Sequence, residues 1–157
     1  MENKEITCCF TGHRVMSAEE EETLARRLRE TLRTLIERGV YRFVSGGALG
    51  FDQLAARVVL ELKREYPHLR LIMMLPCRSQ AARWTPAQAA LYGQILSRSS
   101  EVHYVSENYT AGCMFMRNRA MVDMSGVCVS FLKREKGGTA YTVDYARRQG
   151  VQIIALP

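Results

Sequence analysis

Two glycine-rich segments carry the residues best suited to binding chemistry, and each stands where an apolar run gives way to a helical pattern. Glycine lets a backbone approach an anion closely, and the unpaired amides of a helix's first turn point toward that anion with the positive end of the helix dipole behind them. We therefore expect two phosphate-binding helix starts, although glycines that merely make a turn are the alternative for either one alone. The residues assigned to these sites are Ser45, Gly46, Gly47, Ala48 and Gly50 in the first, and Gly137, Gly138, Thr139 and Thr142 in the second.

Side chains after the first apolar run could contact the same ligand. The segment Thr11-Gly12-His13-Arg14 offers a hydroxyl donor, a tight turn and a planar guanidinium fork that suits phosphate. A satisfied turn histidine and a solvated arginine are the alternative. Asp52, in the first turn of the helix behind the first glycine segment, either complements the helix dipole or accepts a hydrogen bond from a ribose or base.

Arg117 and Asn118 lie in a helical stretch that is otherwise rich in methionine. Charged groups are rarely covered unless they are paired, so this placement favours a functional role. The alternative is that Arg117 or Arg119 forms an ion pair with Asp123. We include Arg117 and Asn118 among the expected ligand-binding residues.

Trp84, Gln88 and Tyr92 recur at four-residue spacing and are expected on one face of a helix. Packing of this face against a sheet is the favoured interpretation. A tryptophan beside a cleft could instead cover a ring of a ligand.

Six short apolar runs alternate with five helical patterns, and these elements must position the residues above. Strands are expected at residues 5–10, 41–44, 69–75, 101–105, 126–132 and 151–156. The alternation predicts βαβ units in one α/β domain over residues 1–157, with three layers: a mostly parallel sheet of about six strands and helices on both faces. Ligands bind such sheets at the carboxyl ends of the strands, so the loops after the first, second, third and fifth strands are candidate sites.

The bulk composition limits the classes of protein to consider. With 47% hydrophobic and 24% charged residues and no apolar run of membrane-spanning length, we expect a cytoplasmic protein without membrane contact. The net charge of +6 is compatible with nucleic acid or with phosphorylated small ligands.

Cysteine usage points to neither a disulfide framework nor a metal site. None of the five cysteines belongs to a C-x-x-C pair or lies near a histidine at zinc-ligand spacing. Core packing is expected for those in apolar runs, whereas two fall in predicted loops and could be accessible. The first set is Cys8, Cys9 and Cys128, and the second is Cys77 and Cys113.

Taken together, these motifs resemble the YpsA-like branch of the SLOG superfamily, which also includes the DNA-processing protein A core and the Lonely Guy (lysine-decarboxylase-like) phosphoribohydrolases. The resemblance covers essentially the whole chain and implies a Rossmann-like fold. It also implies a sensor or regulatory protein that binds a nucleotide or a nucleotide-derived ligand, such as a nucleotide sugar or ADP-ribose. It rests on Cys9-Phe10-Thr11-Gly12-His13-Arg14, Ser45-Gly46-Gly47-Ala48-Leu49-Gly50-Phe51-Asp52, Trp84 with Gln88 and Tyr92, Arg117-Asn118-Arg119-x-Met121-Val122-Asp123, and Gly137-Gly138-Thr139.

The enzyme branch of that superfamily looks like G-G-x-G-T-x-x-E on the last loop, with an R-K-x-x-M helix before it. The resemblance places Asp144 where that family has its catalytic glutamate and gives Arg117 a catalytic role, should this chain be a hydrolase. An acid one methylene short can misplace a general acid by about an ångström, which costs on the order of a hundredfold in rate. The sequence departs from the enzyme pattern at Lys136, Ala140, Tyr141 and Asp144.

Three functions follow from these observations. The favoured one is binding of a small nucleotide-type ligand with no required cofactor and no metal. The second is an N-glycosidase acting on nucleoside 5'-monophosphates. The third is binding of single-stranded DNA, which is not favoured because the chain lacks a run of aromatic residues with basic neighbours. A homodimer is expected, since proteins related to this branch commonly associate.

Overall fold

The computed structural model describes residues 3–133 and 136–157. Its single sheet has six strands in the order β4-β3-β2-β1-β5-β6, and every neighbouring pair is parallel. This confirms the predicted three-layer α/β fold. The strands are β1 (Thr7–Gly12), β2 (Arg42–Ser45), β3 (Arg70–Leu75), β4 (Glu101–Tyr104), β5 (Val127–Phe131) and β6 (Gln152–Ala155).

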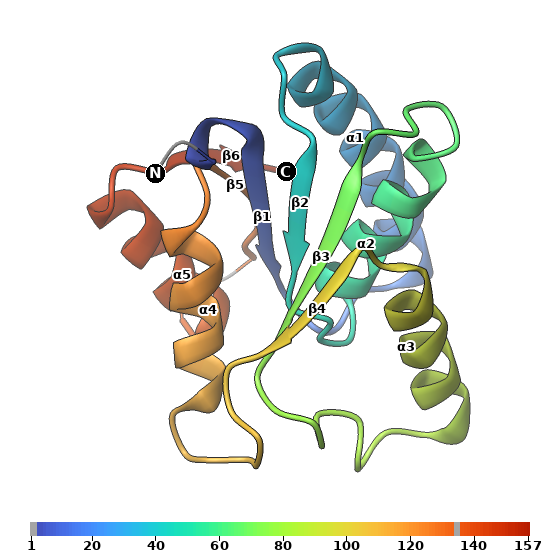
Figure 1. The fold of residues 1–157 in the computed structure, drawn as a ribbon, viewed down its shortest axis with the longest axis vertical. Coiled ribbons are helices and arrows are strands. Elements are labelled where there is room, and N and C mark those ends of the chain that lie inside the picture. The colour runs from blue at the N-terminus through green and yellow to red at the C-terminus, as the bar shows by residue number, and fades with distance from the viewer. Residues whose placement is uncertain (1–2, 134–135) are drawn as a thin grey trace.

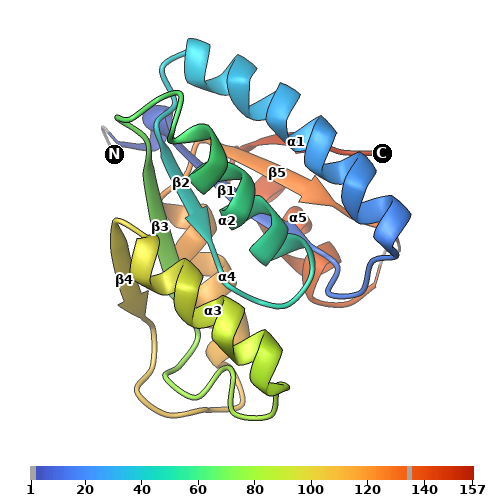
Figure 2. The same ribbon diagram turned by 90° about the vertical axis from the view of Figure 1, so that its right-hand side faces the viewer.

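Helices cover both faces of the sheet. Helices α1, α2 and α3 lie on one face, and α4 and α5 lie on the other, as Figure 1 shows with the two groups on opposite sides of β1–β3. Turned by 90°, the molecule presents α1, α2 and α3 in front of the sheet (Figure 2). The helices are η1 (Lys4–Ile6), α1 (Ala18–Glu37), α2 (Phe51–Leu62), α3 (Pro86–Arg98), α4 (Cys113–Asp123) and α5 (Gly138–Arg148).

Local sequence signals account for the longest helix. Ser17 and Glu20, which have the Ser-x-x-Glu spacing of a capping box, form one at the start of α1, with each side chain accepting from the other residue's backbone amide. The leucines of this helix recur at three- and four-residue spacing, which places them on one face, and all of them are buried in the core. These leucines are Leu24, Leu28, Leu32 and Leu35.

The sheet alternates its side chains between two cores. In β1, Cys8 and Phe10 belong to the larger core under α1, α2 and α3, whereas Cys9 belongs to the smaller core under α4 and α5. Because successive side chains of a strand point to opposite faces, Thr11 is placed on the same face as Cys9. The hydroxyl-bearing end of β1 therefore lies on the α4–α5 side.

Two local expectations were wrong. The first strand extends through Gly12 instead of ending at Phe10, because Thr11 and Gly12 pair with Ser130 and Phe131 of β5. Trp84 is not helical, since α3 begins at Pro86 behind the cap of Thr85. The packing interpretation of this region holds, because Trp84 meets the buried ring of Tyr92 edge to face at 5.1 Å.

The expectation that two cysteines lie in accessible loops is also wrong. Cys77 and Cys113 are 2% and 0% exposed, so neither thiol reaches solvent. Cys113 is the first residue of α4, where the helix packs on the sheet, and so it does not lie in a loop. All five thiols are free and buried.

The strand order reverses between β1 and β5. From β1 the chain moves outward through β2 and β3 to β4, then returns by α4 to β5 on the other side of β1. Loops that leave neighbouring strands in opposite directions open a crevice at such a point. In the described residues, no helix is both long and apolar enough to span a bilayer.

A substitution at Gly12 tests how tightly the end of β1 is packed. A Cβ at this position would overlap the fully buried ring of Phe51 in α2. We predict that Gly12→Ala lowers the free energy of unfolding by about 1–3 kcal/mol, measured by urea titration. The matched control is Gly93→Ala in α3, where an added Cβ meets nothing within 4 Å, and this change should stabilise by about 0.5–1 kcal/mol. Equal effects of the two substitutions would contradict the packing assigned to Gly12.

Candidate functional site

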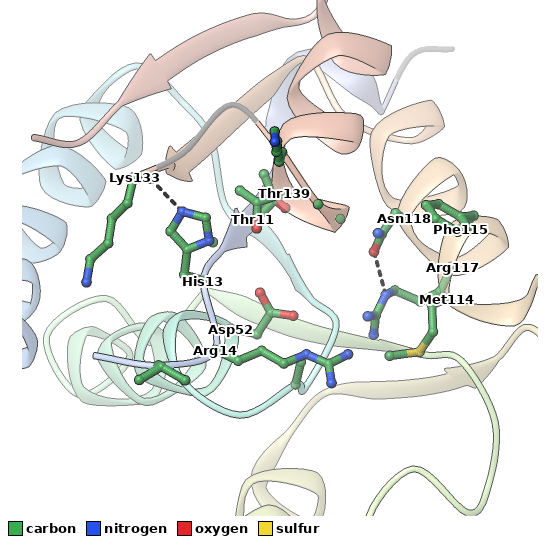
Figure 3. A pocket seen from close by; sticks show the side chains of 16 residues that line it. Thr11, His13, Arg14, Asp52, Met114, Phe115, Arg117, Asn118, Lys133 and Thr139 are labelled. Atoms are coloured by element: carbon green, nitrogen blue, oxygen red, sulfur yellow. Dashed lines mark hydrogen bonds between the residues drawn. The ribbon is translucent and has the colours of Figure 1, made fainter. Parts of the chain in front are cut away.

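A cavity of about 490 Å³ opens at the carboxyl ends of β1 and β5, where the strand order reverses. Its walls come from the segment after β1, the start of α2, the first half of α4 and the start of α5 (Figure 3). The loop after β3 contributes no wall. The lining residues are Thr11, Gly12, His13, Arg14, Val15, Ala48, Asp52, Met114, Phe115, Arg117, Asn118, Lys133, Lys136, Gly137, Gly138 and Thr139.

The start of α5 faces this cavity with open main chain. Gly137 is the N-cap residue and has φ +91°, a conformation that side chains rarely adopt. It provides no side-chain cap, and Gly138 and Thr139 follow it in the first turn. The orphan amides of this 11-residue helix and the positive end of its dipole are therefore available to an anion.

Two arginines converge on the cavity from different elements. Figure 3 shows the guanidinium groups of Arg14 and Arg117 extending toward one another near Asp52. Arg117 is only 3% exposed, and its Nη1 donates to the carbonyl of Gly46 at 2.6 Å while its Nε donates to Asn118 at 2.8 Å. In the part of the chain that the structure describes, no carboxylate oxygen lies within 4.0 Å of the Arg117 nitrogens.

The charges of Arg14, Arg117 and Asp52 influence one another because Arg117 and Asp52 are buried. Burial lowers the pKa of Arg117, and the nearby Arg14 lowers it further, whereas Asp52 opposes both effects. Burial raises the pKa of Asp52 to about 6, against the opposing influence of Arg117, the amide of Ala48 and Arg14. Among the described residues that line the cavity, Asp52 is the one acidic residue, beside the basic residues Arg14, Arg117, Lys133 and Lys136.

The glycine-rich segment after β2 was expected to be a phosphate-binding helix start, but most of it is buried. Ser45, Gly46, Gly47 and Ala48 are buried, and only Ala48 and Asp52 line the cavity. Its polar groups are used internally, because the Ser45 hydroxyl donates to the Asp52 carbonyl at 2.8 Å and the Ala48 amide donates to the Asp52 carboxylate. The negative group held by this loop is a side chain of the protein itself.

Close packing explains the glycines of the same loop. A Cβ on Gly46 would lie 2.5 Å from Nη1 of Arg117 and 2.9 Å from a carboxylate oxygen of Asp52. A Cβ on Gly50 would overlap the backbone carbonyl of Arg14, and its φ of +84° already disfavours other residues. These glycines bring the segments after β1 and β2 and the start of α4 into contact.

His13 connects the segments after β1 and β5. Its Nε2 accepts a hydrogen bond from the backbone amide of Lys133 at 2.5 Å, and its ring meets Phe131 edge to face at 5.9 Å. Figure 3 shows this contact at the edge of the cavity. Lys133 also pairs with Glu20 at the start of α1. His13 is therefore a positioning residue for the loop after β5.

Asp144, assigned from the enzyme resemblance, and Thr142, assigned to the second phosphate-binding helix start, are not among the residues that line the cavity. Asp144 does not line the cavity; its side chain is 65% exposed and pairs with Arg148 at 2.9 Å. Thr142 is buried in α5, where its hydroxyl donates to the carbonyl of Gly138. A carboxylate on the solvent side of α5 is poorly placed to protonate a group bound at the start of that helix.

The alternative ion pairs for the α4 arginines are not formed. Arg119 donates to the hydroxyl of Tyr141 at 2.6 Å, and Asp123 accepts from the hydroxyl of Tyr145 at 2.6 Å. Arg117 turns instead toward Gly46 and the cavity. Arg117 therefore lines the cavity, and its role in ligand binding stays a prediction.

Sequence reasoning missed five residues that line the cavity. Lys133 and Lys136 follow β5, and their position after a strand at the point of order reversal was a usable signal. Met114 and Phe115 carried no signal, because an apolar residue in a short helix is usually assigned to the core, and Val15 is a lone apolar residue between β1 and α1. Phe115 and Val15 are nevertheless 47% and 80% exposed.

Metal binding has no support from side-chain arrangement. Over residues 3–133 and 136–157, no group of three or more His, Cys, Asp and Glu side chains is placed to hold a metal ion. A ligand would be held by the main chain of α5 and by the basic side chains.

Comparison with known proteins identifies relatives over most of the chain. The YpsA family model, which describes the YspA SLOG family, matches residues 9–153. The uncharacterised SPbeta prophage-derived protein YoqJ of Bacillus subtilis (strain 168) is 32% identical over 120 residues, which cover 69% of this chain and 70% of that protein. A UPF0398 protein of Halalkalibacterium halodurans is 31% identical over 121 residues, which cover 75% of this chain and 64% of the relative.

One solved structure extends the comparison to the fold. DNA processing protein A (DprA) from Streptococcus pneumoniae superposes with a TM-score of 0.70 at 17% sequence identity. The match covers 96% of this chain and 50% of the DprA chain, so the present chain spans about half of that protein's length. At this identity the likeness concerns the fold alone.

The raised pKa of Asp52 predicts a pH dependence of stability. Because its folded pKa of about 6 exceeds the unfolded value near 3.8, the folded state binds the extra proton and stability falls as pH rises from about 4 to 6. Relative to Asp52→Asn, the wild type should lose roughly 2–3 kcal/mol of unfolding free energy across that interval, measured by urea titration at each pH. The other carboxyl groups contribute equally to the pH dependence of both proteins, so their contributions cancel in this difference. A difference that stays constant with pH would contradict the buried carboxylate.

Proposed function

The chain belongs to the YspA SLOG family, and we propose that it binds a nucleotide or nucleotide-derived ligand by its phosphate group in the cavity at the ends of β1 and β5. Family membership and the DprA-like fold support a nucleotide-related or DNA-processing role in general. The ligand class we favour is a free nucleotide, a nucleotide sugar or an ADP-ribose derivative. Binding would serve a sensor or regulatory role.

The charge of the cavity carries this proposal. Of the residues that the structure describes, Arg14, Arg117, Lys133 and Lys136 line it together with a single carboxylate, that of Asp52. Two guanidinium groups held close together repel each other, and a bound phosphate would relieve that repulsion by accepting from both. The amides at the start of α5 add neutral donors aimed at the same anion.

The size of the cavity agrees with a small molecule. Sites for small ligands and cofactors have volumes of about 300–1,000 Å³, and this one measures about 490 Å³. Thr11, Thr139 and Asn118 add hydroxyl and amide groups to the wall, which suit the hydroxyls of a ribose. A phosphate with an attached sugar therefore satisfies both the charged and the neutral donors.

The two alternative functions have weaker support. An N-glycosidase needs an acid at the scissile bond, and Asp144 faces solvent beside Arg148. The net charge of +6 is compatible with binding of single-stranded DNA. Several basic side chains of α1 are nevertheless paired with carboxylates, as in Arg29 with Glu61 and Arg33 with Glu65. Both alternatives also involve a phosphate group, so the basic residues of the cavity do not separate them from the favoured function; the exposed position of Asp144 and the ion pairs of α1 do.

Calorimetric titration with AMP, with adenosine as its phosphate-free partner, tests the proposal. We expect AMP to bind and adenosine to bind at least tenfold more weakly, because the phosphate carries most of the attraction. Arg14→Gln should weaken AMP binding about tenfold or more, since a hydrogen bond to a charged group contributes about 1.5–3 kcal/mol.

The matched control is Arg27→Gln on the exposed face of α1. It makes the same change of charge at a residue that does not line the cavity, so AMP affinity should stay within about twofold. Failure of AMP and of ADP-ribose to bind would remove the proposal. So would equal affinities for AMP and adenosine.

A further inference from the structure

Phe115 is an apolar side chain that the fold leaves open at the edge of the cavity. It is 47% exposed, whereas most large apolar residues of the chain are buried. It is also the only Phe, Tyr or Trp among the described residues that line the cavity. Figure 3 shows it beside Asn118 on the α4 side, across from Arg14 and Asp52.

The ring of Phe115 is held in place by contacts between α4 and α5. Tyr141 meets it edge to face, with the ring centroids 4.8 Å apart and the planes at 75°. Tyr141 is fixed in turn, because its hydroxyl accepts from Nε of Arg119 at 2.6 Å. Arg119 also lies over the ring of Tyr145, whose hydroxyl donates to Asp123. A ring supported in this way loses little conformational entropy when a ligand packs against it.

A second hollow of about 340 Å³ is also lined by Phe115. Its lining is Phe115, Met116, Arg119 and Tyr141. Phe115 therefore borders both a cationic cavity and a hollow with aromatic, thioether and guanidinium walls. These groups favour a planar, polarizable ring, which aromatic and guanidinium groups contact by stacking.

Packing between α4 and α5 accounts for only part of this arrangement. Residues 115, 119 and 123 of α4 alternate with residues 141 and 145 of α5, as expected of two helices in contact. Such packing explains the positions of Tyr141, Arg119 and Tyr145. It gives no reason for an exposed phenyl ring at the end that borders the cavity.

We propose that Phe115 is the stacking surface for the nucleobase of the ligand, so that a bound nucleotide places its phosphate near Arg14 and the start of α5 and its base against α4. This inference rests on the proposed function and adds to it that the base is recognised. It predicts that the protein prefers nucleotides to sugar phosphates. The nucleotide can come from two sources, a free nucleotide or a nucleic acid strand.

The test compares AMP with ribose 5-phosphate, which keeps the sugar and phosphate but lacks the base. Stacking of a base on an aromatic side chain contributes about 1–3 kcal/mol, so wild-type protein should bind AMP about 5- to 150-fold more tightly. In Phe115→Leu this preference should fall to about twofold or less. The affinity for ribose 5-phosphate should stay unchanged, which also shows that the variant is folded.

Tyr109→Leu is the matched control, because Tyr109 is 67% exposed and does not line the cavity. This variant should keep the full preference for AMP. Equal affinity of wild-type protein for AMP and ribose 5-phosphate would overturn the stacking role while leaving the phosphate site standing. Binding of neither compound would remove the free nucleotide as source together with the proposed function.

A labelled oligothymidylate distinguishes the source of the base. Binding that is at least tenfold weaker in Phe115→Leu, in the absence of AMP binding, would support stacking with a strand as the ligand. Oligothymidylate binding that Phe115→Leu leaves unchanged, together with an undiminished AMP preference in that variant, would overturn the inference.

Discussion

A buried arginine connects α4 with the loop that follows β2, and the site depends on this contact. Arg117 projects from α4, on one face of the sheet, and donates to the carbonyl of Gly46 at the end of β2. A guanidinium group that is 3% exposed must keep its hydrogen bonds, because an unsatisfied buried charge is destabilising by several kcal/mol. The contact therefore fixes the position of α4 relative to the loop after β2. The walls of the cavity depend on that distance.

The two glycine-rich helix starts look alike in sequence but have different surroundings. The loop after β2 encloses the Asp52 carboxylate, and its glycines serve the close approach of Arg117 and of the Arg14 backbone. The start of α5 has no side-chain cap and opens into the cavity. One segment thus builds the electrostatic environment while the other presents donors. The buried carboxylate of Asp52 stabilises Arg117 in a position where burial alone would disfavour its charge.

This division of roles suits reversible binding of an anion. Arg14 and Arg117 lie close together, so their charges repel each other, and an anion that accepts from both would relieve this repulsion. A site whose charges are positioned in advance loses little reorganisation energy on binding. Such preorganisation is consistent with a sensor, and the exposed position of Asp144 offers no comparable arrangement for acid catalysis.

The sequence alone determined the α/β fold, because apolar runs, glycines and the Ser17 capping box are local signals that agree with one another along the chain. It also brought Thr11, Arg14, Asp52 and Arg117 into one candidate site, since parallel strands place their carboxyl ends together. Only the tertiary structure decided which glycine segment stays open and that Phe115 borders the cavity. Those outcomes depend on contacts such as Arg117 with Gly46, made between residues 71 positions apart, which no local pattern encodes.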